Sequence, residues 1–224
     1  MKVDKEVLEF LKKIKKNNNR EWFKEHKPQF DALKSEVEIF YQSIKDGLSE
    51  EDEIEKLKVY RIYRDIRFSK DKTPYKSHFA GSFSRSGKSL RGGYYLRISP
   101  GESFLAGGFW GPNKEDLFRI RKEFEISDVE IREILAAPDF KKYFNGRLEG
   151  NELKTAPKGF QKDDPAIDLI RKKAFIAIRK FTDQEVLALE FKDEVIRSFR
   201  ALRPYFDYMS EVLTTDLNGV SIID

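Results

Sequence analysis

The spacing of apolar residues changes along this chain of 224 residues, and this change constrains the fold more than any other feature. Between about residues 59 and 110, apolar and polar residues alternate, as they do in β-strands with one buried face. Turn signals, among them Pro74 and Pro100-Gly101, divide this region into short segments. The expected strands cover residues 59–68, 77–85, 94–99 and 104–110. Short turns between successive strands indicate an antiparallel meander.

Helical periodicity is found on both sides of this region. The expected N-terminal helices are Asp4–Asn17, a short helix over 20–27, and a longer one that starts at Pro28 and ends at Gly47. The expected C-terminal helices begin at Asn113, at the Ser127/Glu130 capping pair, at Pro165, at the Thr182/Glu185 capping box and at Lys192, and Pro204 should kink or split the last one. Residues 174–181 alternate like a further strand.

No linker, repeat or low-complexity tract interrupts these elements. The sequence therefore predicts a single α+β domain over residues 1–224. Its antiparallel sheet should comprise about residues 59–110 and a strand near 174–181, covered by N- and C-terminal helices.

Several kinds of chemistry are excluded by composition. The chain has no cysteine, which excludes disulfides, thiolate metal sites and cysteine nucleophiles. His26 and His78 lack the spacing of metal ligands, so no metal site is expected. Ser86-Gly87-Lys88-Ser89 resembles the end of a phosphate-binding P-loop, but position 82 is Ser where the motif needs Gly, so we interpret it as a hairpin turn. No cofactor is expected.

No apolar stretch reaches the roughly 18 residues of a membrane span, and the N-terminus lacks the apolar core of a signal peptide. We therefore expect a cytoplasmic protein that has no membrane partner. The sequence gives no oligomeric state.

Positive charge is concentrated in one part of the chain. The formal net charge is +4, whereas residues 61–97 contain ten basic and two acidic residues and so carry +8. A basic segment on an otherwise acidic chain can focus potential toward an anion. Alternatively, carboxylates from flanking helices pair with these side chains, because paired arginines are common inside folds. Both interpretations remain open at this stage.

The basic segment suggests a binding site. In a strand over 59–68, Arg61 and Arg67 would share one face, with Tyr63 and Asp65 between them. Arginine forks bind phosphate or carboxylate through paired, charge-assisted hydrogen bonds, and lysines of the next loop would add to them. His78 is either a general base or a structural histidine. The candidate ligand-binding residues are Arg61, Tyr63, Asp65, Arg67, Lys72, Lys76 and His78.

Competing interpretations accompany this hypothesis. The same charges could form Arg–Asp pairs on a half-exposed sheet face. Arg64 has apolar neighbours in the sequence, and we expect it to form a buried ion pair with Asp71. Gly107-Gly108 precedes Phe109 and Trp110, and glycines in a strand mark either tight packing or a ligand close to the backbone.

Four sequence segments carry a family resemblance. They are NNNREWF at 17–23, RIYRDIRFSKDKTPYK at 61–76, GGYYLRISPGESFLAGGFW at 92–110 and APKGF at 156–160. With these segments, spread over most of its length, the chain resembles the bacterial and fungal family known as domain of unknown function 2461. The resemblance implies a single domain; it implies no mechanism and no catalytic residues.

The expected function is binding of an anionic, phosphate-containing small molecule. The sequence leaves open whether the protein also converts this ligand as an enzyme. The alternative is a non-enzymatic module that interacts with nucleic acid or protein, since basic residues alternate with aromatic ones in this segment. The absence of a recognised nucleic-acid motif and the small net charge make nucleic acid the weaker candidate.

Overall fold

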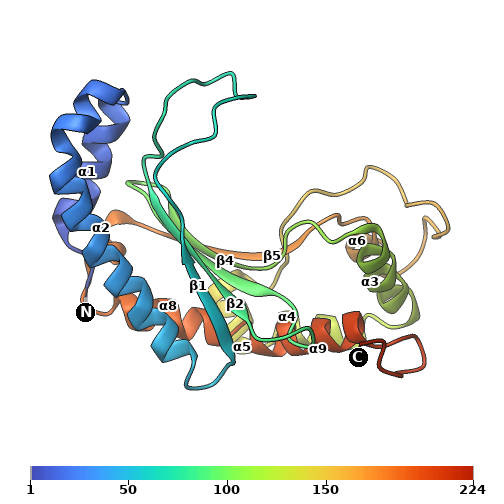
Figure 1. The fold of residues 1–224 in the computed structure, drawn as a ribbon. Helices are drawn as coiled ribbons and strands as arrows, with labels where there is room; N and C mark the ends of the chain where they lie inside the picture. Colours follow the sequence, from blue (N-terminus) through green and yellow to red (C-terminus); the bar gives the residue numbers. More distant parts are fainter. Residues whose placement is uncertain (1, 224) are drawn as a thin grey trace. The chain divides into compact units, whose positions relative to one another are not determined.

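The computed structural model describes residues 2–223. Its centre is a five-stranded antiparallel sheet in which the strands lie in chain order (Figure 1). The strands are β1 (Ile54–Val59), β2 (Phe79–Arg85), β3 (Gly93–Ile98), β4 (Ser103–Phe109) and β5 (Phe175–Phe181). N- and C-terminal helices pack against this sheet, so the predicted α+β fold is confirmed.

The helices precede and follow the meander. They are α1 (Lys5–Lys16), α2 (Arg20–Leu48), α3 (Lys114–Ile126), α4 (Val129–Ala136), α5 (Pro138–Phe144), α6 (Ile167–Ile170), α7 (Asp183–Leu187), α8 (Phe191–Arg200) and α9 (Arg203–Thr214). Side chains of Asp4, Asn19 and Asn113 accept hydrogen bonds from the first turns of α1, α2 and α3. The Thr182/Glu185 capping box is present, and Pro204 lies in the first turn of α9, where it separates α9 from α8. None of the described helices is both long and apolar enough to span a membrane.

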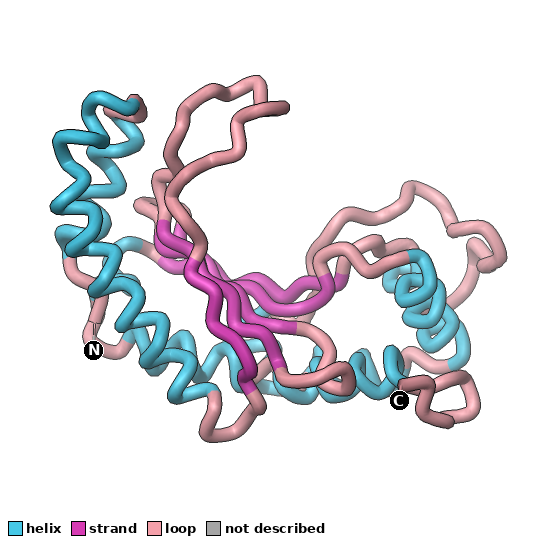
Figure 2. The backbone as a smooth tube through the Cα atoms, in the orientation of Figure 1, coloured by secondary structure: helices cyan, strands magenta, loops and turns pink. Residues whose placement is uncertain are grey.

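Three local predictions were wrong. The first strand is residues 54–59 rather than 59–68, and residues 60–78 form a long connection between β1 and β2 (Figure 2). The two helices expected on either side of Pro28 are one helix, α2, which continues through the proline. Helix α4 begins after Asp128 without a side-chain cap, so the Ser127/Glu130 capping box is absent.

Pairing at the base of the 60–78 connection explains the first error. The backbone N–H of Lys76 donates to Ile62 (2.8 Å) and that of Arg64 donates to Pro74 (2.9 Å), so the two arms pair over a short distance only. Pro74 has no N–H with which to extend the ladder. Residues 65–68 therefore lie outside any strand although their sequence alternates.

The described chain is organised in two compact units. Unit 1 contains the chain up to Phe83, together with Tyr95–Leu105 and Lys180–Arg197. Unit 2 contains Ser84–Tyr94, Ala106–Arg179 and the chain from Ser198 onward. Strands β2 to β5 contribute residues to both units. The single domain expected over residues 1–224 stays a prediction.

In unit 1, helix α2 packs on β2. Phe30 stacks on Phe79 with 5.8 Å between ring centroids, and Tyr41 lies 6.1 Å from Phe83. A Cβ at Gly81 would stand 2.7 Å from the Tyr41 ring, so only glycine allows this close approach. The buried Tyr41 hydroxyl donates to the carbonyl of Leu96 at 3.0 Å.

In unit 2, helix α9 packs on the residues of β3 and β4 that belong to this unit. Tyr94 contacts Phe206 at 5.0 Å between centroids, and a Cβ at Gly107 would stand 2.3 Å from the Leu202 side chain. Gly108 adopts a φ of +138°, and a Cβ there would stand 2.1 Å from the carbonyl oxygen of Phe175 in β5. The Gly107-Gly108 pair therefore serves tight packing, which decides between the two interpretations given above.

Candidate functional site

The connection over residues 60–78, which we call the basic loop, is fixed to the N-terminal helices. The Asn18 side chain donates to the carbonyl of Tyr75 (2.9 Å) and accepts from the N–H of Tyr75 (3.0 Å). The Tyr75 ring stacks on Phe23 with centroids 4.1 Å apart, and Tyr63 meets Phe23 edge-on at 6.2 Å. One amide and one phenylalanine thus hold both arms of the loop.

Most charges at the tip of the basic loop are paired within it. Arg67 binds Asp65 through two hydrogen bonds of 2.6 and 3.0 Å, and this contact lowers the pKa of Asp65. Arg64 pairs with Asp71 at 2.5 Å, as predicted, although the Asp71 side chain is 59% exposed rather than buried. Hydrogen bonds from the Thr73 backbone, then from Arg64, lower the pKa of Asp71 to about 2. The Lys72 ammonium donates to the carbonyl of Ile66.

Arg61, Tyr63, Asp65 and Arg67, which were expected to share one strand face, therefore lie in the basic loop outside the named strands. Arg61, Asp65, Arg67 and Lys72 are exposed along the loop, and Tyr63 packs toward Phe23. Their role in ligand binding stays a prediction. Lys76 and His78 differ from the others, because both lie where the loop returns to β2.

Lys76 and His78 adjoin a set of half-buried side chains on one face of the sheet in unit 1. In β3, Tyr94, Leu96 and Ile98 are buried, whereas Tyr95 and Arg97 are half-buried on the opposite face. Phe104 of β4 and Tyr60 after β1 are their neighbours. We call this set the aromatic-basic face: Tyr60, Lys76, His78, Tyr95, Arg97 and Phe104.

Its aromatic rings follow one another across the strands. Tyr95 lies 6.3 Å from Tyr60 and 5.6 Å from Phe104, measured between ring centroids. The Tyr60 hydroxyl is hydrogen-bonded to Ser82 of β2 at 3.2 Å. Cross-strand aromatic pairs of this kind stabilise a sheet. Because the rings are half-buried, they also offer apolar surface to a planar ligand.

Cations border these rings. The ammonium groups of Lys58 and Lys76 lie 5.3 and 5.6 Å from the centre of the Tyr60 ring, and the Arg97 guanidinium lies 5.9 Å from that of Phe104. Neither lysine has a carboxylate partner among the described residues; Lys76 donates to the carbonyl of Arg61. Arg97 contacts the exposed Glu102 at 3.2 Å, while its buried Nε has no hydrogen-bond partner.

His78 reports the positive potential of this face. Burial, together with the nearby Arg97 and Lys76, lowers its pKa to about 4. The imidazole is therefore neutral at pH 7 and offers one hydrogen-bond donor and one acceptor. Burial and Arg61 also lower the pKa of Lys76, and burial raises the pKa of Tyr95.

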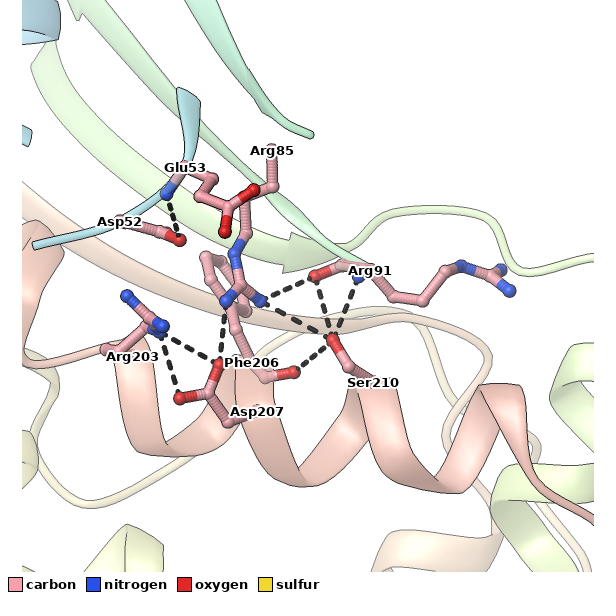
Figure 3. A network of polar contacts seen from close by, with 8 residues as sticks. All are labelled: Asp52, Glu53, Arg85, Arg91, Arg203, Phe206, Asp207 and Ser210. Atoms are coloured by element: carbon pink, nitrogen blue, oxygen red, sulfur yellow. Dashed lines mark hydrogen bonds and ion pairs between the residues drawn. The ribbon is translucent and has the colours of Figure 1, made fainter. Parts of the chain in front are cut away.

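Arg85 and Arg91 of the basic segment do not belong to the aromatic-basic face; each pairs with a carboxylate of a helix. The Arg85 side chain is fully buried in unit 2, where it pairs with Asp207 at 2.7 Å and lies over the Phe206 ring (Figure 3). Its guanidinium also reaches the carbonyl of Arg91 (3.2 Å). The Arg91 side chain pairs with Asp116 of α3 at 2.6 Å. For these two residues, carboxylates of the helices neutralise the positive charge, as the alternative interpretation predicted.

The Ser86–Ser89 turn carries no phosphate-binding geometry. It joins β2 to β3, with Gly87 at a φ of +69°, and no helix follows it. The hairpin interpretation is confirmed. Within residues 2–223, no group of three or more His, Asp or Glu side chains is arranged to hold a metal ion.

Sequence reasoning missed Tyr60, Tyr95, Arg97 and Phe104 as candidate site residues. The alternation of Tyr95 and Arg97 with buried neighbours is visible in the sequence. Which face the helices cover is decided by contacts such as those of Tyr41 with Gly81, and these join segments far apart in the chain. The sequence alone showed only that positive charge is concentrated in residues 61–97.

Comparison with known proteins identifies a family but no relative of known activity. No curated protein and no solved structure shows a significant match to this chain. The model of one family, described as conserved hypothetical protein (DUF2461), matches residues 6–208. This match covers most of the chain and includes every residue of the aromatic-basic face. The protein therefore belongs to the DUF2461 family of conserved hypothetical proteins.

Proposed function

We propose that the aromatic-basic face binds an anionic small molecule that carries both a phosphate group and a planar ring, such as a nucleotide. The observation that carries this proposal is the Tyr60 ring, which has the ammonium groups of Lys58 and Lys76 at 5.3 and 5.6 Å. Neither ammonium is paired with a carboxylate among the described residues. An anion at this position would therefore meet positive charge that is not already neutralised.

Each residue has a distinct role in this proposal. Lys76 and Arg97 bind the phosphate oxygens through charge-assisted hydrogen bonds, and Arg97 exchanges its exposed contact with Glu102 for the ligand. The rings of Tyr60 and Tyr95 stack on the planar group. Neutral His78 donates a hydrogen bond to the ligand or accepts one from it.

The arrangement supports binding better than proton transfer. A general base works best when its pKa is near the operating pH, whereas the pKa of His78 is about 4. A phosphate bound between Lys76 and Arg97 would raise this pKa again, because both cations lower it in the unliganded protein.

Thermal-shift and calorimetric titrations test the proposal. We expect ATP and AMP to stabilise the protein more than ribose 5-phosphate or inorganic phosphate, because only the nucleotides add stacking. Lys76→Gln and Arg97→Gln should each weaken nucleotide binding by about tenfold or more, the effect of losing a charged hydrogen bond. Lys24→Gln, an exposed site on α2, removes the same charge and should leave binding unchanged.

A second pair of variants shows whether the ligand binds at the aromatic-basic face or at the basic loop. If Arg61→Ala and Arg67→Ala abolish binding while Lys76→Gln and Arg97→Gln do not, the ligand occupies the basic loop and the present assignment is wrong. Absence of stabilisation by every anion in the series would reject anion binding altogether.

Single-stranded nucleic acid is a second candidate ligand. The rings of Tyr60, Tyr95 and Phe104 follow one another across the face, with 6.3 and 5.6 Å between successive ring centroids. Successive bases can stack on such an arrangement. Oligonucleotides that bind more tightly than mononucleotides, with an affinity that falls steeply with salt, would favour this candidate. Equal affinity for a nucleotide and an oligomer would favour the small molecule.

A further inference from the structure

A buried phenol in unit 2 lacks the hydrogen bond that such a group normally makes. Tyr208 of α9 is 6% exposed, and its hydroxyl is buried without a hydrogen-bond partner among residues 2–223. Buried tyrosine hydroxyls usually find a partner, because an unsatisfied polar group is costly to bury. This hydroxyl is independent of the aromatic-basic face, which belongs to unit 1.

Tyr208 lines a cavity of about 130 Å³ between α3, α4, α9 and the C-terminal segment. This volume is large enough for several waters or for one small organic ion. We call it the acidic cavity, because its charged lining residues are four carboxylates and one arginine: Arg119, Glu123, Glu130, Glu211 and Asp216.

Contacts within the lining leave negative charge in excess. Arg119 pairs with Glu123 at 2.7 Å and donates to the carbonyl of Thr215 at 3.1 Å. Asp216 accepts from two backbone N–H groups of the C-terminal segment, which lower its pKa. Glu130 and Glu211 are exposed, and neither has an ion-pair partner among the described residues. A ligand of this cavity must therefore be positively charged.

The chemistry of the lining selects among cations. The carboxylates and the phenol oxygen can all accept hydrogen bonds, and a primary ammonium group provides three donors. A metal ion fits less well, because no group of three or more described side chains is arranged to hold one. The geometry points to a small primary ammonium ion as the ligand of the acidic cavity, bound by Tyr208, Glu130 and Glu211.

Ligand-observed NMR with methylammonium chloride tests this inference on the full chain. We expect saturable binding to the wild-type protein, and binding at least tenfold weaker for tetramethylammonium, which has the same charge but no N–H donor. Glu130→Gln and Glu211→Gln should each weaken methylammonium binding by about tenfold. Glu133→Gln, an exposed site on the same helix α4 and outside the cavity, should bind like the wild type.

Tyr208→Phe distinguishes a ligand-binding hydroxyl from a merely buried one. Because the variant removes a hydroxyl that has no partner, its melting temperature without ligand should equal or exceed that of the wild type. Its affinity for methylammonium should fall about tenfold. No saturable binding to the wild type, or equal binding of tetramethylammonium, would overturn the inference.

Discussion

His78 illustrates how a single side chain can report the charge around it. The ring is half-buried where the basic loop joins β2, and the nearest charges that act on it are the cations Arg97 and Lys76. Burial and these charges favour the neutral imidazole and bring its pKa to about 4, well below the usual value near 6.5. Its titration is therefore a probe both of stability and of ligand binding.

Stability should decrease as the pH is lowered from about 6.5 toward 4. In this window the unfolded chain binds a proton at His78 while the folded protein does not, so protonation favours unfolding. The loss is at most roughly 3 kcal/mol for a shift of this size. Urea denaturation at pH 7 and pH 5 measures it, and His78→Gln should flatten the dependence. A slope that is unchanged in the variant would show that other groups cause it.

The basic loop is an element whose conformation depends on one distant amide. Asn18 makes two hydrogen bonds with the backbone of Tyr75, at 2.9 and 3.0 Å, in the manner of a neighbouring strand. Tyr75 is buried against Phe23, so these bonds are shielded from water. The position of Lys76 in the aromatic-basic face depends on this attachment, since Lys76 directly follows Tyr75.

Asn18→Ala should loosen the basic loop without unfolding the helices. Loss of two backbone contacts costs about 1–3 kcal/mol. Amide hydrogen exchange should accelerate in residues 60–78 and stay slow in β3 and β4, and the proposed nucleotide affinity should fall as well. Asn17→Ala, in the same turn, is the matched control, because the Asn17 side chain bonds only within α1, to Lys13. Equal effects of the two substitutions would contradict the assigned role of Asn18.

Elements whose signals are local were predicted well, and elements set by distant contacts were not. Strands β2 to β5 and the helix starts at Asp4, Asn19 and Thr182 follow from alternation and capping residues. Pro28 suggested a helix boundary, yet α2 continues through it, because Phe23 and Phe30 on either side are both buried. Tertiary packing here outweighs the local penalty of proline.

The sequence also indicated only part of the candidate site, because local patterns do not show contacts between distant segments. Excess positive charge in residues 61–97 drew attention to this region, and two of the predicted residues, Lys76 and His78, lie at the aromatic-basic face. Alternation could not show that Arg67 turns back to Asp65 or that Arg85 is buried against α9. These pairings arise from the loop conformation and from helix packing, which have no pattern in the local sequence.

At the scale of the whole molecule, two compact units are built on shared strands. Strands β2 to β5 each contribute residues to both units, so neither unit has a complete set of strand residues of its own. Because the same strands supply residues to both units, we expect the chain to unfold as a single domain.

The two tryptophans provide a direct test of that prediction. Trp22 belongs to unit 1 and Trp110 to unit 2. Urea unfolding followed by fluorine NMR of fluorotryptophan should give the same midpoint and slope for both signals, because one cooperative transition is expected. Trp22→Phe and Trp110→Phe assign the two resonances. Midpoints that differ beyond experimental error would show two domains that unfold independently.

The fully buried Arg85 has a consequence for how the chain is made. Its carboxylate partner Asp207 follows it by 122 residues in the chain. While the ribosome synthesises that interval, the guanidinium lacks this partner, and we expect water to hydrate it and the adjoining end of β2. Final closure of this part of the protein therefore awaits the emergence of α9 from the exit tunnel, and nascent chains that stop short of it should be preferred substrates of cellular proteases.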